Sequence, residues 1–339
     1  MSPKYCGCLL LAFSLLVALV GCNSAPQSRA KYRVAVIPKG TAHDFWKSIH
    51  AGAAAAAHDR GDTQIFWDGP AKEDLRHEQQ QIVERFTSEH VGAIVLAPCD
   101  RLTLAGPVER ALRQGIPVVI MDSGLELPES ARAMDSYLGY IATDNRQGGV
   151  EAAKRTIELV KGKEHPKVLM IRYQAGSEST EQREAGFRST IRSEPAIDYI
   201  EASDEAGASV DSAQRVAERL LSDHKNLDGI FTPNESSTVG TLRALEVLHR
   251  AGEVKLVGFD AGEILIQALA AGKLHGLVLQ DPFGMGYQSV MRAVEHLEGK
   301  PPPADRTRYT NLKVATKENM NDPAIKELYA RDLNQYLNP

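Results

Sequence analysis

The sequence predicts an α/β protein made of two doubly wound, Rossmann-like parallel-sheet domains, and three observations lead to this prediction. Short β-branched runs alternate with helical patterns, the alternation continues for about ten strands, and the 339 residues exceed the usual size of a single core. One open sheet of ten strands would be unusually wide. Alternating strands and helices build parallel sheets with helices on both faces, so we expect two such domains.

The first half of the alternation covers residues 33–144. Its apolar runs indicate buried parallel strands: RVAVIP at 33–38, QIFWD at 64–68, AIVLAP at 93–98, PVVIMD at 117–122 and YIATD at 140–144. Between the second and fourth runs, residues 73–89 and 102–114 have their apolar side chains on one helical face. This periodicity predicts crossover helices.

The second half repeats the pattern. Its runs are KVLMIRY at 167–173, DYIEASD at 198–204, GIFTPN at 229–234, KLVGFD at 255–260 and HGLVLQD at 275–281. Almost every run ends at an acid or amide, such as Asp122, Asn234 or Asp260. Ligands of doubly wound sheets bind outside the carboxyl ends of the strands, but the same residue types also cap the following helices. The pattern alone leaves open which of them contact a ligand.

The first 22 residues indicate export. Lys4 precedes an apolar run over residues 8–20 that is too short to span a membrane comfortably, and the run ends in Leu-Val-Gly-Cys22. This ending resembles the lipobox of bacterial lipoproteins, which implies a signal peptide over 1–21, lipidation of Cys22 and a polar tether over 22–31. A plain secretory signal with a chance cysteine is the alternative.

Composition and motifs exclude several functions. The formal charge of -5 is mixed along the chain without a basic cluster, so we expect no nucleic-acid partner. After export Cys99 is the only unmodified cysteine, so no intramolecular disulfide is expected. The motifs G-x-S-x-G, H-E-x-x-H and C-x-x-C are absent, and we expect no cofactor, no metal and no enzymatic activity. Residues 284–289 mimic a dinucleotide fingerprint and are interpreted as close helix packing.

A series of motifs resembles the ribose-binding-protein-like family of periplasmic sugar-binding proteins over nearly the whole chain from residue 32. The motifs occur in the family's order: VAVIPKGTAHDFWKSIHAG, PVVIMDSG, YIATDNRQGG, AGSESTEQREAGF, GIFTPNESSTVGTLRAL, LVGFDAG and LVLQDP. The resemblance implies a type I periplasmic binding protein with a three-segment hinge near residues 143–145, 280–282 and 308–310. The lobes would be 32–143 plus 281–309 and 144–280 plus 310–339.

Aligned on these motifs, the resemblance also implies a ligand site. Phe45 and Trp46 match the family's aromatic pair, and its polar contacts fall on Asp122, Arg183, Asn234, Asp260 and Gln280. A sugar needs planar polar groups around its edge and an aromatic ring against its face, and these residue types provide both. The alternatives are a core position for Phe45, a solvated ion pair for Arg183 and plain helix capping for Asn234 and Asp260.

This chain departs from the family in its polar loops. Ser123 replaces an arginine after Asp122, which puts ribose itself in doubt. Lys39 and His43 replace small or amide residues, so a sugar acid or sugar phosphate becomes conceivable; alternatively, Lys39 pairs with a carboxylate such as Asp122 and His43 caps the helix. The family's aromatic residue in the second lobe is missing, because its position falls in the small residues 206–209.

The resemblance implies a monomeric solute-binding protein that closes on a sugar or sugar-derived small molecule and delivers it to an ABC permease. It would work on the periplasmic side of a bacterial envelope, tethered to a membrane through lipidated Cys22. The alternatives are a sensor that presents the bound sugar to a membrane signalling receptor and, less favoured, an exported carbohydrate-active enzyme.

Overall fold

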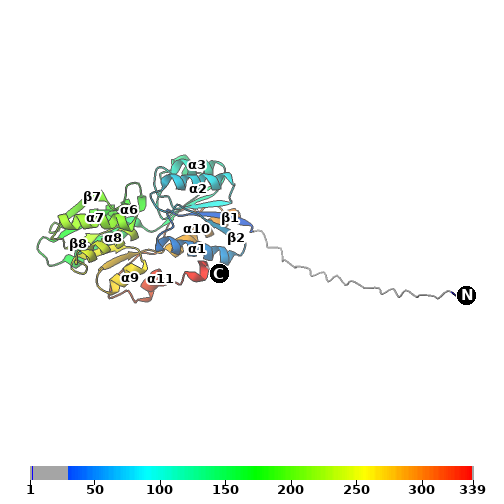
Figure 1. The fold of residues 1–339 in the computed structure, drawn as a ribbon. Coiled ribbons are helices and arrows are strands. Elements are labelled where there is room, and N and C mark those ends of the chain that lie inside the picture. Colours follow the sequence, from blue (N-terminus) through cyan, green and yellow to red (C-terminus); the bar gives the residue numbers. More distant parts are fainter. Residues whose placement is uncertain (1, 3–29, 338–339) are drawn as a thin grey trace.

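The computed structural model describes Ser2 and residues 30–337 (Figure 1). The predicted signal peptide, Cys22 and most of the tether therefore lie outside the described residues. Two lobes follow one another along the view, each with a sheet between helices. None of the helices in the described part of the chain combines the length and apolar character that a membrane span needs.

The first lobe is built on a six-stranded parallel sheet in the order β11-β5-β4-β3-β1-β2. Its strands are β1 (Tyr32–Ile37), β2 (Thr63–Trp67), β3 (Ala93–Leu96), β4 (Val118–Met121), β5 (Tyr137–Ala142) and β11 (Thr307–Tyr309). Its helices are α1 (Asp44–Arg60), α2 (Arg76–Ser88), α3 (Ala105–Arg113), α4 (Glu129–Arg132) and α10 (Pro282–Leu297).

The second lobe repeats this plan in the order β12-β10-β9-β8-β6-β7, with β12 antiparallel to β10. Its strands are β6 (Lys167–Arg172), β7 (Asp198–Glu205), β8 (Gly229–Phe231), β9 (Lys255–Phe259), β10 (Gly276–Leu279) and β12 (Lys313–Ala315). Its helices are α5 (Asn145–Val160), α6 (Glu178–Ile191), α7 (Val210–Asp223), α8 (Glu235–Val247), α9 (Glu263–Ala270) and α11 (Pro323–Tyr329).

The ten predicted strands are confirmed as β1 to β10, and the predicted fold class is confirmed with them. The chain passes between the sheets three times, after β5, after β10 and between β11 and β12. The edge strands β11 and β12 were not predicted, because each has three residues and β11 is exposed. Strands this short lack the run of apolar residues that identifies a buried strand.

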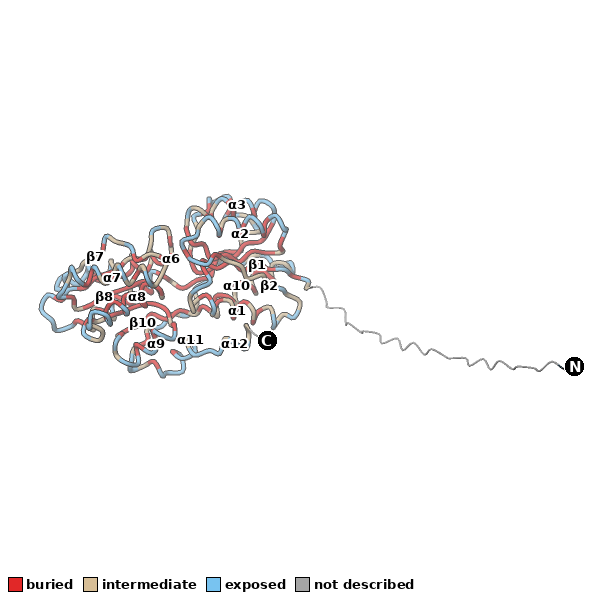
Figure 2. Tube along the Cα trace, in the orientation of Figure 1, coloured by how far each residue is buried: buried red, intermediate tan, exposed pale blue. Residues whose placement is uncertain are grey.

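Each sheet is buried on both faces. In β1, Val34 and Val36 pack under α1 and α10, whereas Ala35 and Ile37 pack under α2 and α3. Successive side chains of a strand point to opposite faces, so a strand covered on both sides must be apolar throughout. Figure 2 shows the resulting buried layer through both lobes. Cys99 belongs to this core and is a free thiol.

Glycines bring the helices next to the cleft close together. A methyl group on Gly52 of α1 would lie 2.0 Å from the carbonyl oxygen of Phe283 in α10. In the second lobe, a methyl group on Gly149 of α5 would lie 1.9 Å from the carbonyl oxygen of Arg183 in α6. Gly286 of the predicted packing segment approaches the Ile49 carbonyl in the same way, at 2.1 Å, which confirms that interpretation.

The C-terminal segment returns to the first lobe. After α11, which contacts β10 and β12, residues 330–333 lead to α12 (Asn334–Leu337), which contacts α1. The Arg331 guanidinium lies 4.1 Å from the centre of the Phe283 ring, and the Tyr336 ring lies 5.2 Å from it. The segment assigned to the second lobe from the sequence thus ends on the first. We call residues 330–337 the C-terminal strap.

Candidate ligand-binding cavity between the lobes

A narrow cavity lies between the two lobes, at the carboxyl ends of strands from both sheets. All nine ligand contacts expected from the sequence line it: Lys39, His43, Phe45, Trp46, Asp122, Arg183, Asn234, Asp260 and Gln280. Four further residues also line it: Glu73, Ser179, Thr180 and Glu235. Its free volume is only about 20 Å³, so the lobes must separate before a sugar can enter between them.

Two aspartates occupy equivalent places in the two lobes. Asp122 follows β4 with φ 62°, and Asp260 follows β9 with φ 73°. The N–H of Asp122 donates to Ile141 in β5 at 2.9 Å, and that of Asp260 donates to Val278 in β10 at 3.0 Å. Left-handed backbone is costly for a residue with a side chain and is concentrated at functional sites. Both lobes thus present a buried acid to the cavity in the same unusual conformation.

Lys39 is fully engaged by protein groups. Its ammonium lies 3.0 Å from Asp122 Oδ2 and donates to the hydroxyls of Ser179 at 2.8 Å and Ser177 at 3.4 Å. These partners account for its three N–H bonds. Of the two interpretations of Lys39, the structure contains the pairing with Asp122. Because both serines belong to the second lobe, Lys39 also joins the lobes.

His43 faces Glu73 instead of capping α1. It stands at the N-cap position with extended backbone, but its side chain makes no capping hydrogen bond, so the capping alternative is wrong. Its Nε2 lies 3.9 Å from Glu73 Oε1. Glu73 in turn accepts hydrogen bonds from Trp46 Nε1 and from the hydroxyl of Tyr173 in the second lobe, both at 2.8 Å.

The aromatic pair serves the core and the cavity together. The rings of Phe45 and Trp46 meet edge to face, with centres 4.9 Å apart and planes at 87°. Trp46 is 2% exposed and packs in the core beneath the first sheet, whereas Phe45 is partly buried. Both of the interpretations given for Phe45 hold in part, because it lines the cavity and packs against the same core.

Arg183 is held flat above the Phe259 ring, at 4.3 Å from its centre. Its guanidinium donates to Asn145 Oδ1 at 2.8 Å, to the Pro233 carbonyl at 2.9 Å and to Gln280 Oε1 at 2.8 Å. It is 3% exposed, so the solvated ion pair is wrong. Among the described residues, each terminal nitrogen has one protein acceptor, which leaves each with one N–H for a ligand oxygen.

The amides connect the cavity to the hinge. Gln280 donates to Asp260 Oδ1 at 2.6 Å and accepts from the Thr143 hydroxyl at 2.7 Å, so it joins two of the three crossings. Asn234 caps α8, as its alternative interpretation expected, through a capping box in which its Oδ1 accepts from Ser237 N. Its Nδ2 donates to the Ser236 hydroxyl at 3.2 Å and has a second N–H.

Glu235 crosses from the second lobe to the first. Its carboxylate accepts from the backbone N–H groups of Asp44 at 3.3 Å and Phe45 at 3.1 Å, in the first turn of α1. Its own N–H donates to Asp260 Oδ2 at 2.8 Å. Burial and the nearby charge of Asp260 raise the pKa of Glu235 to about 7. Burial also raises the pKa of Asp260, although Arg183 opposes this shift.

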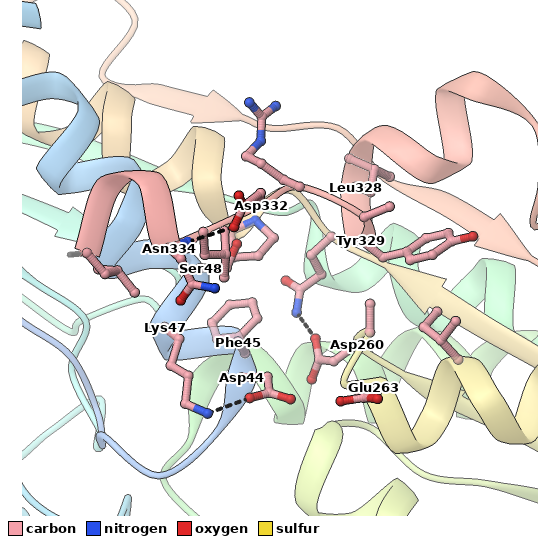
Figure 3. A pocket seen from close by; sticks show the side chains of 18 of the residues that line it. Asp44, Phe45, Lys47, Ser48, Asp260, Glu263, Leu328, Tyr329, Asp332 and Asn334 are labelled. Atoms are coloured by element: carbon pink, nitrogen blue, oxygen red, sulfur yellow. Dashed lines mark hydrogen bonds and ion pairs between the residues drawn. The ribbon is translucent and has the colours of Figure 1, made fainter. Parts of the chain in front are cut away.

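A larger groove of about 590 Å³ adjoins the cavity and shares Phe45, Asp260 and Gln280 with it. Figure 3 shows the C-terminal strap on one side of this groove, with Asp332 and Asn334 above Phe45 and Ser48. Asp260 and Glu263 lie on its other side.

Sequence reasoning missed four lining residues, and for two of them a signal exists. Ser179 and Thr180 precede Arg183 by four and three residues in α6, so they share its helical face. Glu235 follows Asn234 directly, but a glutamate in a first helical turn is usually solvated. Glu73 lies in the connection between β2 and α2, where no periodicity indicates its direction.

The lining of the cavity is rich in hydrogen-bonding groups. The described residues contain no group of three or more histidines, cysteines or acids placed to hold a metal ion. The cavity instead collects carboxylates, amides, hydroxyls and a guanidinium beside aromatic rings. Such a set can donate to and accept from several hydroxyls of one polar ligand.

Comparison with known proteins gives concordant results. The sequence profile of the family described as periplasmic binding protein domain matches residues 34–301. The D-ribose/D-allose-binding protein of Pseudomonas aeruginosa is 27% identical over 298 residues, covering 84% of this chain and 91% of that protein. The D-allose-binding periplasmic protein of Escherichia coli is 26% identical over 289 residues, covering 85% and 92%.

The solved structures agree with the fold. An ABC transporter solute-binding protein of Agrobacterium vitis with bound D-fucose superposes with a TM-score of 0.82 at 31% identity, covering 88% of this chain and 99% of that chain. The resemblance recognised in the motifs and the two-lobed type I fold are confirmed. The chain therefore belongs to the periplasmic binding protein family.

Proposed function

We propose that this protein is the solute-binding component of an ABC importer and captures a sugar or sugar-like molecule between its lobes. The observation that supports this most directly is the cavity itself. It lies at the carboxyl ends of both sheets, and its lining combines polar groups from both lobes with the edge of an aromatic pair. Relatives that match most of the chain bind ribose or allose.

Closure of the hinge provides the mechanism. Lys39 reaches Ser179, Glu73 reaches Tyr173 and Glu235 reaches the start of α1, so three sets of hydrogen bonds depend on the lobes being together. A ligand that touches both lobes binds the closed form more tightly than the open form and shifts the equilibrium toward it. The permease then recognises the closed conformation of the two lobes.

In this proposal each lobe has a distinct part. From the first lobe, Phe45 and Trp46 lie against the apolar face of the ring and Asp122 lies at its edge. From the second lobe, Arg183 donates its two remaining N–H bonds to ligand oxygens, while Asn234 and Asp260 bind further hydroxyls. Gln280 ties these contacts to the hinge. The lobes move as 32–143 plus 281–309 and the C-terminal strap against 144–280 plus 310–329.

The cellular setting belongs to the proposal as well. The family is periplasmic, and the N-terminal sequence supports a chain that is exported and anchored through lipid on Cys22. Replacing Cys22 with alanine should release the protein from membranes into the soluble fraction of the envelope. A Cys22→Ala protein that stays in the membrane fraction would contradict the anchor.

A thermal-shift screen of the mature chain from residue 23 tests the binding function. The panel contains D-ribose, D-allose, D-fucose, D-galactose and D-glucose, with the matching sugar acids, phosphates and polyols. A ligand at a thousand times its Kd adds about 4 kcal/mol to stability, which shifts the Tm by several degrees. The Arg183→Ala protein should lose the shift. No shift with any member of the panel would contradict a sugar-binding function.

A further inference from the structure

The cavity contains more acids than bases. Four carboxylates line it, from Glu73, Asp122, Glu235 and Asp260, against two fixed cations, Lys39 and Arg183, so the lining has two negative charges in excess when all four acids are ionised. Buried charges without counterions are costly, and a ligand that brings a charge of the same sign adds to that cost. The net charge of the cavity is therefore a means of choosing a ligand.

Neither cation can easily serve an anionic ligand alone. Lys39 uses its three N–H bonds on Asp122 and two serines. Arg183 has two N–H bonds to offer, but its charge also acts on Asp260, whose pKa it lowers against the effect of burial. An anionic ligand bound to Arg183 would compete with Asp260 for the positive charge of the guanidinium.

The excess charge is centred on Glu235 and Asp260, whose acids are neighbours. Besides Asp260, the charged or titratable groups around Glu235 are His43, whose charge would stabilise the carboxylate, and Asp44 and Lys47. Asp44 and Lys47 form an ion pair with each other at 2.8 Å, and both side chains are largely exposed. Glu235 itself is bound by two backbone N–H groups and by no fixed cation among the described residues.

We propose that the cavity selects its ligand by charge: it excludes sugar acids and sugar phosphates and prefers a sugar with a protonated amine, and Glu235 sets this preference. The inference rests on the proposed sugar-binding function and narrows its substrate class. An ammonium group placed beside Glu235 and Asp260 supplies the missing counterion and three N–H donors. A carboxylate or phosphate placed there meets two acids.

Matched sugars that differ in one substituent test the proposal by calorimetry. The sets are D-glucose, D-glucosamine, D-glucuronate and D-glucose 6-phosphate, and the corresponding sets built on D-galactose, D-mannose and D-allose. In the set that contains a binding sugar, we expect the amino sugar to bind about tenfold more tightly than its neutral parent, and the two anionic forms at least about tenfold more weakly.

Two variants identify the residue responsible. The Glu235→Gln protein loses the charge of Glu235 and keeps Asp260 as the one acid beside the ammonium, so its preference for the amino sugar over the parent should be much smaller. The Glu178→Gln protein is the matched control, because Glu178 also begins a helix of the second lobe and accepts a first-lobe N–H, from Gly124 at 2.8 Å. The control should keep the full preference.

The possible failures are distinguishable. An acid or phosphate that binds as tightly as its neutral parent, an amino sugar that binds no more tightly than its parent, or an unchanged preference in Glu235→Gln overturns the charge selection and leaves sugar binding intact. If neither neutral nor charged sugars bind at all, the proposed function fails, and the charge selection fails with it.

Discussion

The two lobes present the same acid to the cavity in the same backbone conformation but surround it differently. Asp122 in the first lobe is paired with the Lys39 ammonium at 3.0 Å. Asp260 in the second lobe accepts hydrogen bonds from neutral donors, the Gln280 amide and the Glu235 N–H, and the charge of Arg183 acts on it without an ion pair between them. The charge of a buried acid in an ion pair is neutralised within the protein. The charge of a buried acid without an ion-pair partner can act on a bound ligand. In the proposed function, the first lobe therefore supports the site and the second lobe selects the ligand.

Replacing each aspartate with asparagine should give the largest difference in stability between the two lobes. Asparagine tolerates left-handed backbone, so the change removes the charge without new strain. Asp122→Asn leaves the Lys39 ammonium buried without its counterion and should lower the free energy of unfolding by about 3–5 kcal/mol. Asp260→Asn should cost about 1 kcal/mol. Urea denaturation measures both; equal losses would show that the two acids are equivalent.

For ligand affinity, Asp260→Asn should have a larger effect than Asp122→Asn. Asp260→Asn removes a charged acceptor from the selecting lobe and should weaken binding of the sugar found in the screen by about tenfold to a hundredfold. Its fold should remain intact by circular dichroism. Calorimetry gives the affinity directly, and an unchanged Kd would remove Asp260 from the binding residues.

Two glycines at helix contacts, Gly52 in the first lobe and Gly149 in the second, allow the packing of the two lobes to be compared. Gly52→Ala and Gly149→Ala each drive a methyl group against a carbonyl oxygen in the paired helix, so each should cost about 1–3 kcal/mol of stability. Only Gly149→Ala displaces Arg183, so only this variant should also weaken ligand binding. Gly106→Ala is the control, because Gly106 is an exposed position of α3 and its methyl group would meet nothing closer than 3.5 Å. Equal affinities for the Gly52 and Gly149 variants would contradict the role of Arg183.

Glu235 of the second lobe should also make ligand affinity depend on pH. Opening the cleft should expose Glu235 and return its pKa toward the ordinary value of 4.5, whereas burial and the charge of Asp260 raise it to about 7 in the closed form. Closure thus takes up a proton between these values, and affinity for a neutral sugar should rise about tenfold as the pH falls from 8 to 6.

The Glu235→Gln protein should show a flat profile over the same range. His43→Gln separates any contribution of the imidazole that faces Glu73. A neutral sugar that binds more weakly as the pH falls, in a protein with Glu235 intact, would contradict the assignment.

The smallest effect concerns the contact that ties the C-terminal strap to the first lobe. Arg331→Ala removes the cation above the Phe283 ring and should cost about 0.5–1 kcal/mol. The ligand dissociation rate, followed by stopped-flow fluorescence, should rise slightly. Lys317→Ala, in the same C-terminal region, is a surface control that should change neither quantity.

The strands could be predicted because buried strands and crossover helices follow local periodicity, whereas the nine lining residues were implied by the family resemblance. Asp122, Asn234, Asp260 and Gln280 follow buried strands, and parallel strands bring such ends to one edge. Glu235 and Glu73 were missed because their roles depend on how the lobes meet. No local periodicity tells that Glu235 reaches the first turn of α1, 190 residues away from Phe45 in sequence.

The path of the C-terminal strap has a mechanical consequence. The described chain starts in the first lobe with β1 and ends against α1 of the same lobe, so the second lobe is inserted between two parts of the first. A force that pulls the two ends of the chain apart would therefore act first on the first lobe and on the attachment of the strap, and only then on the second lobe. Pulling on the termini would measure how firmly the strap is attached, whereas hinge opening requires a handle on the second lobe.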